Sequence, residues 1–204
     1  GLARQRCLDA ATGDLITFID ADDIFVTPFA LEILLRGIKQ KNVVEVQGTF
    51  LQEIKDKNTD MRIMPRSDIG HPWVFGRLYN IKFLRDSGIQ FSDLRAMEDG
   101  ELNWKIRMTI EGTPLTIVKT DDPVYLWRIG SEHSITRIGI EKNDGVPLYN
   151  WDLCQVGATA ASINAIKFCR KKNPFNGNVT RFTVEMMIGH YFTYRSEEHT
   201  SELQ

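Results

Sequence analysis

The chain of 204 residues lacks the cysteine pattern, the charge excess and the long apolar runs that mark several protein classes. Its three cysteines, Cys7, Cys154 and Cys169, have no C-x-x-C spacing, so the sequence indicates neither a zinc site nor a disulfide framework. The net charge of -2 gives no support for nucleic acid as a partner. No apolar run approaches the length of a membrane span. We therefore expect a globular protein of a reducing compartment, the cytoplasm.

A cluster of carboxylates follows the first short apolar run. Residues 15–19 are rich in β-branched and aromatic side chains and predict a buried strand of an α/β sheet. Asp20-Ala21-Asp22-Asp23 comes directly after it, where such sheets bind ligands. Asp20 and Asp22 could turn toward one hard cation, Mn²⁺ or Mg²⁺, that bridges substrate phosphates. The alternative interpretation of these carboxylates is an acidic helix N-terminus or a solvated turn.

Helices are predicted on both sides of this strand. Residues 2–11 read as a helix, and Gly13 stands where a helix C-terminal glycine would. The side chains available for its buried face are Leu2, Cys7, Leu8 and Ala11. After the acids, Thr27 can cap a second helix and Pro28 can occupy its first turn. The apolar stripe of that helix would be Leu31, Leu34, Leu35 and Ile38.

The rest of the chain predicts scaffold elements. Strands are expected at 43–50 and 115–118, and a helix begins at Glu98 with Leu102, Ile106 and Ile110 on one face. Two further helices are expected at 148–170 and 179–194, on either side of a cluster of helix-breaking residues at 173–177.

Three motifs resemble the family 2 glycosyltransferases of the GT-A fold. The first combines Ala3-Arg4 with Ala11-Thr12-Gly13-Asp14 and Phe18-Ile19-Asp20-Ala21-Asp22-Asp23. The second runs from His71-Pro72-Trp73 to the acidic pair Glu98-Asp99. The third joins Val124-Tyr125-Leu126-Trp127-Arg128 to Ser134-Ile135-Thr136. The resemblance implies a partial GT-A, Rossmann-like α/β domain that lacks its N-terminal nucleotide-binding part and is followed by C-terminal helices.

The resemblance also implies a reaction. The donor would be a nucleotide-diphospho-sugar, the acceptor a hydroxyl of a glycan or lipid carrier in cell-surface polysaccharide biosynthesis, and the stereochemistry inverting. Asp22, with Asp20 nearby, would hold Mn²⁺ or Mg²⁺ on the diphosphate. Asp99, paired with Glu98, would be the general base, because a sugar hydroxyl is a poor nucleophile and a carboxylate must accept its proton.

Further positions carry expected binding roles. Arg4 and Asp20 would lie near the nucleotide, while Arg128 and Ser134 would close over the diphosphate, where a permanently charged guanidinium can neutralise the leaving group. Trp73 and His71 would line the acceptor site, since flat aromatic faces pack against sugar rings.

We expect three segments. Residues 1–138 would be the C-terminal part of the glycosyltransferase domain, and residues 139–194 a helical extension. Residues 195–204 match the translation of a common sequencing adapter, so we exclude them from fold reasoning. By itself such a fragment is expected to be inactive, and membrane association, at the inner face, would depend on parts outside it.

Two other classes remain open. In a phosphatase of the haloacid dehalogenase type, Asp20 and Asp22 would be nucleophile and acid, and Asp121-Asp122 a later metal pair. A catalytically silent module would keep the fold and bind a glycan or a partner through the helical tail.

Overall fold

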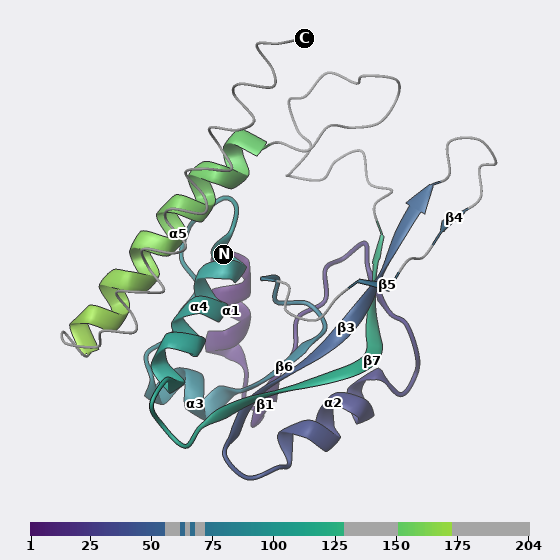
Figure 1. The fold of residues 1–204 in the computed structure, drawn as a ribbon, viewed down its shortest axis with the longest axis horizontal. Coiled ribbons are helices and arrows are strands. Elements are labelled where there is room, and N and C mark those ends of the chain that lie inside the picture. Colours follow the sequence, from purple (N-terminus) through teal and green to yellow (C-terminus); the bar gives the residue numbers. More distant parts are fainter. Residues whose placement is uncertain (56–61, 64–65, 68–71, 129–150, 173–204) are drawn as a thin grey trace. The chain divides into compact units, whose positions relative to one another are not determined.

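The computed structural model describes residues 1–55, 62–63, 66–67, 72–128 and 151–172 (Figure 1). The chain divides into two compact units. The unit of residues 3–90 and 110–133 contains every described strand, and we call it the sheet unit. In the unit of residues 1–2, 91–109 and 134–204 the described residues form two long helices, and we call it the helical unit.

The sheet unit is built on a mixed sheet. Its main path runs in the order β1 (Leu15–Ile16), β6 (Arg77–Asn80), β3 (Val43–Lys55), β7 (Thr116–Arg128) and β2 (Ile24–Phe25). Two short strands, β4 (Arg62–Ile63) and β5 (Arg66–Ser67), also pair with β3. Among the described strands only β3 and β7 pair in parallel, and the other neighbouring pairs are antiparallel. Together with the helices, this sheet confirms the predicted α/β class.

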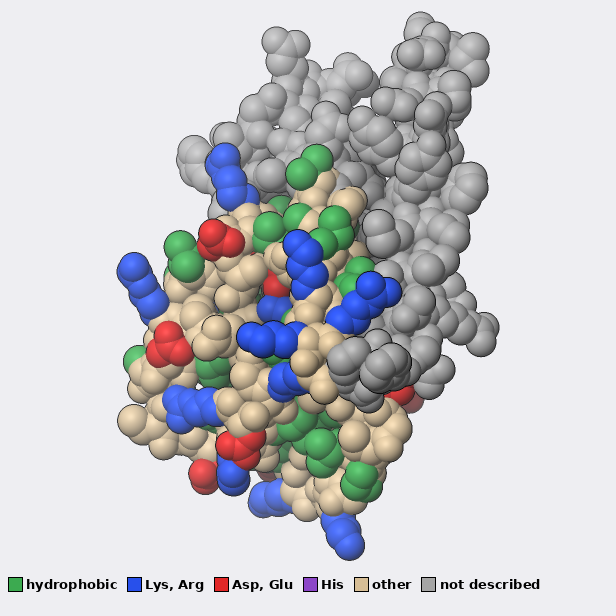
Figure 2. Space-filling model, turned by 90° about the vertical axis from the view of Figure 1, so that its left-hand side faces the viewer, with side chains coloured by type: hydrophobic (Ala, Val, Ile, Leu, Met, Phe, Trp, Pro, Cys, Tyr) green, Lys and Arg blue, Asp and Glu red, His purple; other side chains and the backbone are tan. Residues whose placement is uncertain are grey.

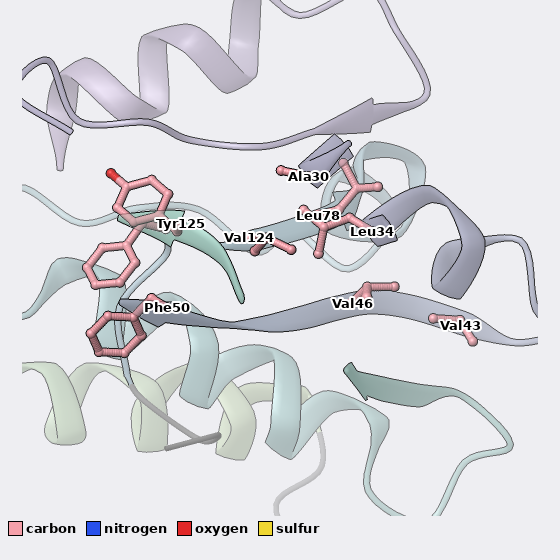
Figure 3. Packing of buried hydrophobic residues seen from close by; sticks show 9 residues of the cluster. Ala30, Leu34, Val43, Val46, Phe50, Leu78, Val124 and Tyr125 are labelled. Carbon is pink, nitrogen blue, oxygen red and sulfur yellow. The ribbon is translucent and has the colours of Figure 1, made fainter. Parts of the chain in front are cut away.

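The core of the sheet unit lies between α2 (Ala30–Ile38) and the sheet (Figure 3). The cluster combines α2 with β3, β6, β7 and the turn before β6, and its buried members are Ala30, Leu34, Val43, Val46, Phe50, Phe75, Leu78, Val124 and Tyr125. Gly37 allows the close approach of α2, because a Cβ at this position would lie 2.9 Å from the methyl carbons of Val46. Burial of this apolar surface supplies the main stabilisation of the unit.

The predicted strand at 15–19 is shorter and less buried than expected. Only Leu15 and Ile16 form β1, both half-buried, followed by a bridge from Phe18 to Phe75. Ile19 is 49% exposed. The reason is topological: among the described strands β1 pairs only with β6, so it lies at a sheet edge instead of between two neighbours.

The helix after the acids begins later than predicted. Thr27 is not its cap: the Thr27 hydroxyl accepts from the backbone N–H of Phe29 at 3.3 Å, in a turn before the first helical residue, Ala30. The predicted stripe is also rotated, since Leu31 is 43% exposed and Gly37 lies on the buried face with Ala30. The local threonine-proline signal marks the turn, and the packing of Ala30 decides where the helix starts.

The first predicted helix is present as α1 (Leu2–Ala10), but its predicted face is mostly wrong. Leu8 is its one buried residue, whereas Leu2 is 62% exposed and Cys7 is exposed. The helix end is held by Arg85, near the end of α3 (Ile81–Asp86), whose guanidinium donates to the carbonyls of Leu8 at 2.9 Å and Ala11 at 2.7 Å. An arginine from elsewhere in the chain thus satisfies the carbonyls that a helix end leaves open.

The strands predicted at 43–50 and 115–118 are present and longer than expected. β3 and β7 each have 13 residues and pair over most of that length. Pro123 is tolerated inside β7 because the register is irregular where it lies opposite Thr49, so a regular ladder hydrogen bond is not required there.

The helices described in the helical unit are α4 (Glu98–Ile110) and α5 (Trp151–Lys172). The helices predicted from Glu98 and over 148–170 are therefore present, and the one at 179–194 lies outside the described residues. Trp104 and Met108 of α4 pack against Ala161, Ala165 and Cys169 of α5.

The contact between α4 and α5 is also polar. Glu101, 1% exposed, forms an ion pair with Lys105 and accepts a hydrogen bond from Asn164 Nδ2 at 3.0 Å.

No helix in the described ranges is long and apolar enough to cross a membrane. On the face shown in Figure 2, basic, acidic and apolar side chains of the described residues are interspersed.

Candidate functional site

The carboxylate cluster forms a tight turn, which we call the acidic turn, residues 20–23. The backbone N–H of Asp23 donates to the carbonyl of Asp20 at 3.1 Å, so Ala21 and Asp22 occupy the two central positions. The turn follows the bridge at Phe18 and leads into β2, which lies at the edge of the sheet opposite to β1. Asp22 is exposed and makes no hydrogen bond or ion pair within the described part of the chain, which leaves its carboxylate available to a ligand.

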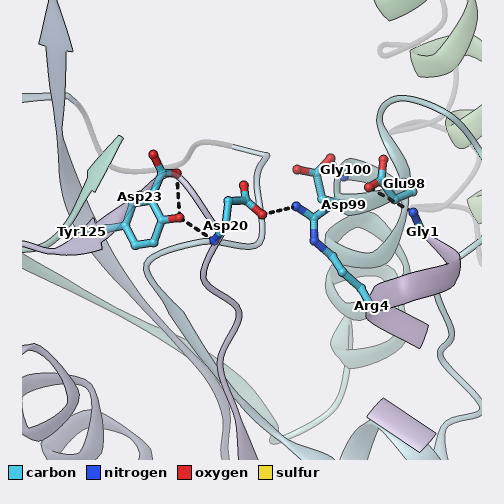
Figure 4. A network of polar contacts seen from close by, with 8 residues as sticks. All are labelled: Gly1, Arg4, Asp20, Asp23, Glu98, Asp99, Gly100 and Tyr125. Carbon is cyan, nitrogen blue, oxygen red and sulfur yellow. Dashed lines mark hydrogen bonds and ion pairs between the residues drawn. The ribbon is translucent and has the colours of Figure 1, made fainter. Parts of the chain in front are cut away.

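The end of β7 holds the acidic turn in place (Figure 4). The Tyr125 hydroxyl accepts from the backbone N–H of Asp20 at 3.1 Å and donates to Asp23 Oδ2 at 2.7 Å. The backbone N–H of Arg128 donates to Asp23 Oδ1 at 2.8 Å. Asp23 is only 7% exposed, and both of its carboxylate oxygens accept a hydrogen bond from β7.

The electrostatics of the acidic turn follow from this burial. Burial raises the pKa of Asp23, the hydrogen bonds from Arg128 and Tyr125 oppose that rise, and the charges of Asp22 and Asp20 add to it. Burial also raises the pKa of Tyr125, as does its bond to Asp23, so the phenol keeps the proton that it donates. The motifs contain both residues, but no sequence signal pairs them, since they are separated by 102 positions.

Arg4 and Asp20, both predicted to lie near the nucleotide, are brought together. Arg4 Nη2 on α1 lies 2.7 Å from Asp20 Oδ1 (Figure 4). The two side chains are 24% and 41% exposed, so the pair is partly open to solvent. Arg4 therefore orients a carboxylate of the acidic turn in this structure.

Arg128 approaches the acidic turn through its backbone, while its side chain takes another partner. Arg128 Nε lies 3.3 Å from Glu53 Oε2, and the two residues are opposite each other in the register of β3 and β7. Ser134, predicted to act with it, lies outside the described residues.

Trp73 belongs to an aromatic cluster that includes Phe50 of β3 and Trp127 of β7. Its ring stacks on Phe75 with centroids 5.4 Å apart and meets the edge of Phe50 at 5.6 Å and the tilted ring of Trp127 at 5.2 Å. Trp73 and Trp127 are half-buried, so each offers part of a flat apolar surface. His71, the other predicted acceptor residue, lies outside the described ranges.

The predicted general base lies in the helical unit. Glu98 and Asp99 occupy the first turn of α4, where the helix macrodipole favours negative charge, and each is 8% exposed. Asp99 Oδ1 accepts from the backbone N–H of Gly100 at 2.8 Å (Figure 4). The residue before the helix, Met97, has a φ of 67°, a left-handed conformation that turns the chain into the helix.

The acidic turn has the donor chemistry that a hard cation requires. Within the described ranges no three histidine, cysteine or acidic side chains come together as a complete metal site. Mg²⁺ and similar ions, however, are commonly held by one or two carboxylates, with substrate phosphates and water as the remaining ligands. Asp22 fits this role because it is exposed, and Asp20 lies in the same turn.

In open α/β sheets ligands bind outside the carboxyl ends of the strands, and the acidic turn is bonded to the carboxyl end of β7. Residues 1–100 match the family model described as Glycosyl transferase family 2, and over these residues the chain belongs to that family. The matched segment contains Arg4, the acidic turn, Trp73 and the Glu98-Asp99 pair. The predicted family is thus confirmed, and the match favours a transferase over the phosphatase alternative.

The other comparisons concern curated proteins and solved structures. None of the curated proteins matches the chain. The crystal structure of S. aureus TarS, residues 1–349, is similar to this chain, with 18% sequence identity and a TM-score of 0.48. The similarity covers 93% of this chain and 58% of that one, so the chain spans less than two thirds of that structure.

Proposed function

We propose that this chain is part of a GT-A glycosyltransferase that transfers a sugar from a nucleotide-diphospho-sugar to an acceptor hydroxyl with inversion. The observation that carries the proposal is the acidic turn, in which Asp22 is exposed while Asp20 and Asp23 are bonded to α1 and β7. This turn lies inside the segment that matches the family.

On the donor side, Asp22, with Asp20, would hold Mn²⁺ or Mg²⁺. The bound cation would supply Lewis-acid assistance to departure of the nucleoside diphosphate. Arg4 keeps the Asp20 carboxylate oriented, and it could exchange this partner for a donor phosphate because the pair is partly exposed. Arg128 and Ser134 are proposed to close over the diphosphate.

On the acceptor side, Asp99 would accept the proton of the attacking hydroxyl, with Glu98 beside it. General bases of this kind typically contribute a factor of about 10² to 10⁴ in rate. Trp73, with His71, would contact the acceptor, whose class we propose to be a glycan or a lipid-linked saccharide of the cell surface. We propose a cytoplasmic location with peripheral docking at the inner membrane face; the free state of all three cysteines supports the cytoplasmic part.

The test uses the protein that carries this chain, Mn²⁺ and a panel of UDP-, GDP- and dTDP-sugars, with release of the nucleoside diphosphate as the readout. We expect Asp99→Asn to lower transfer by a factor of about 10² or more while Mn²⁺-dependent binding of the donor persists. Asp22→Asn should weaken that binding itself, because it removes the exposed carboxylate.

Matched controls separate these roles from general effects of charge. Asp93→Asn removes an exposed acid of the helical unit, and Asp14→Asn removes one of the sheet unit. Neither should change transfer. Normal transfer by Asp99→Asn would remove Asp99 as the base. Donor binding without turnover in the unaltered protein would favour the silent binding module.

A further inference from the structure

The hydroxyl of Tyr125 is the junction between the acidic turn and the sheet. It accepts from the backbone of Asp20 at the first position of the turn and donates to the side chain of Asp23 at the last. With the bond from the Arg128 backbone to Asp23, three hydrogen bonds connect the turn to one strand, β7. The two central residues, Ala21 and Asp22, are exposed.

The position of this hydroxyl is set by the sheet. Tyr125 is 0% exposed, and its ring stacks on Phe75 with centroids 4.5 Å apart and an interplanar angle of 9°. Phe25, its partner in the register of β2 and β7, meets the ring edge-on at 6.4 Å. Because the ring is fixed from both sides, the hydroxyl is a rigid reference point to which the turn conforms.

We propose that Tyr125 is a positioning residue that, through Asp20 and Asp23, holds the acidic turn in the shape that keeps the Asp22 carboxylate available to a divalent cation. Tyr125 itself would touch neither the cation nor the donor. This inference rests on the proposed function, since it assumes that Asp22 binds the metal.

The expected effect follows from the bonds that would be lost. Without the hydroxyl, Asp23 Oδ2 loses its donor in a buried position and the backbone N–H of Asp20 loses its acceptor. The turn can then satisfy these groups only by changing shape or by admitting water. Removing a group that orients a metal ligand typically costs about 10- to 100-fold in metal affinity.

The test is Tyr125→Phe in the protein that carries this chain, with affinity for Mn²⁺ alone measured from the electron paramagnetic resonance signal of the free ion. Phenylalanine keeps the ring that packs on Phe75 and removes only the hydroxyl. We expect Mn²⁺ to bind about tenfold more weakly, or worse, with the circular dichroism spectrum unchanged. The matched control is Tyr79→Phe, which removes a hydroxyl from another tyrosine that is 0% exposed, in β6, and should leave Mn²⁺ binding unchanged.

The outcomes separate the inference from the function on which it rests. If the unaltered protein binds Mn²⁺ and Tyr125→Phe binds it equally well, the positioning role is wrong. If Tyr79→Phe weakens binding as much, the effect is general destabilisation, and the inference is again overturned. If the unaltered protein binds no Mn²⁺, either alone or with a nucleoside diphosphate that supplies the phosphate ligands, the metal-dependent function itself is refuted.

A second variant covers the case in which Tyr125→Phe does not fold. Asp23→Asn removes the carboxylate that accepts from Tyr125, while its amide oxygen can still accept from the backbone of Arg128. It should weaken Mn²⁺ binding more than Asp14→Asn, which removes one exposed negative charge elsewhere in the sheet unit. Equal affinities for these two variants would refute the inference.

Discussion

The buried ion pair between β3 and β6 gives the strongest stability prediction. The side chains of Glu45 and Arg77 are 1% and 0% exposed, and Arg77 Nη1 donates to Glu45 Oε1. Arg77 Nε also donates to the carbonyl of Trp73 at 2.7 Å. The second carboxylate oxygen of Glu45 is buried without a hydrogen-bond partner in the described structure, so Glu45 depends strongly on Arg77.

Replacing Arg77 by methionine tests this dependence. The variant leaves the Glu45 carboxylate in the core without its cation and releases the carbonyl of Trp73. Breaking a buried pair by removing one partner costs about 3 to 5 kcal/mol. The free energy of unfolding of a protein is only about 5 to 15 kcal/mol, so the loss of this ion pair would remove a large fraction of it. With a urea dependence of about 2 kcal/mol per M, a loss of about 3 kcal/mol lowers the unfolding midpoint by about 1.5 M.

The assay is urea unfolding followed by tryptophan fluorescence and circular dichroism. The double variant Glu45→Leu/Arg77→Met should recover most of the lost stability, because replacing both partners of a buried pair by apolar groups is often neutral. The control is Arg36→Met, which breaks an exposed pair with Glu32 on α2 and should not move the midpoint measurably. The reasoning fails if Arg77→Met unfolds at the same urea concentration as Arg36→Met, or if the double variant is no more stable than Arg77→Met.

Two further predictions concern packing and thiol chemistry. A Cβ at Gly48 would lie 2.5 Å from a methyl carbon of the buried Val124, so Gly48→Ala should destabilise the protein by about 1 to 3 kcal/mol in the same urea assay. Burial raises the pKa of Cys169 to about 11, despite the nearby lysines, which lowers its reactive thiolate fraction at neutral pH. Iodoacetamide should therefore label the exposed Cys7 but not Cys169 in the folded protein, as read by mass spectrometry, and label both in urea. Equal labelling of the two thiols before unfolding would contradict the burial of Cys169.

The sequence predicted the elements whose signals are local. The helix at Glu98 was identified by its apolar spacing and acidic first turn, and α4 begins at that residue. Residues 43–50 and 115–118 were identified as strands by their side-chain types. The full lengths of β3 and β7 were not predicted, because their pairing passes through register irregularities and through Pro123, which a local rule treats as a break.

Faces and helix starts were predicted less well, since they depend on what packs against the element. Leu31 has the right spacing for the apolar stripe of α2, yet it is 43% exposed. Gly37 lies on the buried face because α2 approaches Val46 too closely for a side chain. Periodicity identifies a helix, whereas the neighbouring surface selects which of its sides is covered.

The candidate site shows the same division between local and distant causes. The position of Asp20 and Asp22 after a short apolar run predicts their metal role, and the structure places Arg4 beside Asp20. The nucleotide role of Arg4 and Asp20 stays a prediction. The sequence predicts no role for Asp23. Its burial depends on hydrogen bonds donated by Tyr125 and Arg128, and both residues lie on the distant strand β7. An aspartate that packs against a tyrosine more than a hundred residues away has no sequence period. The structure therefore adds, to a turn predicted to bind a metal, the buried contacts that hold it in one shape. Those contacts make the role proposed for Asp22 testable apart from its charge.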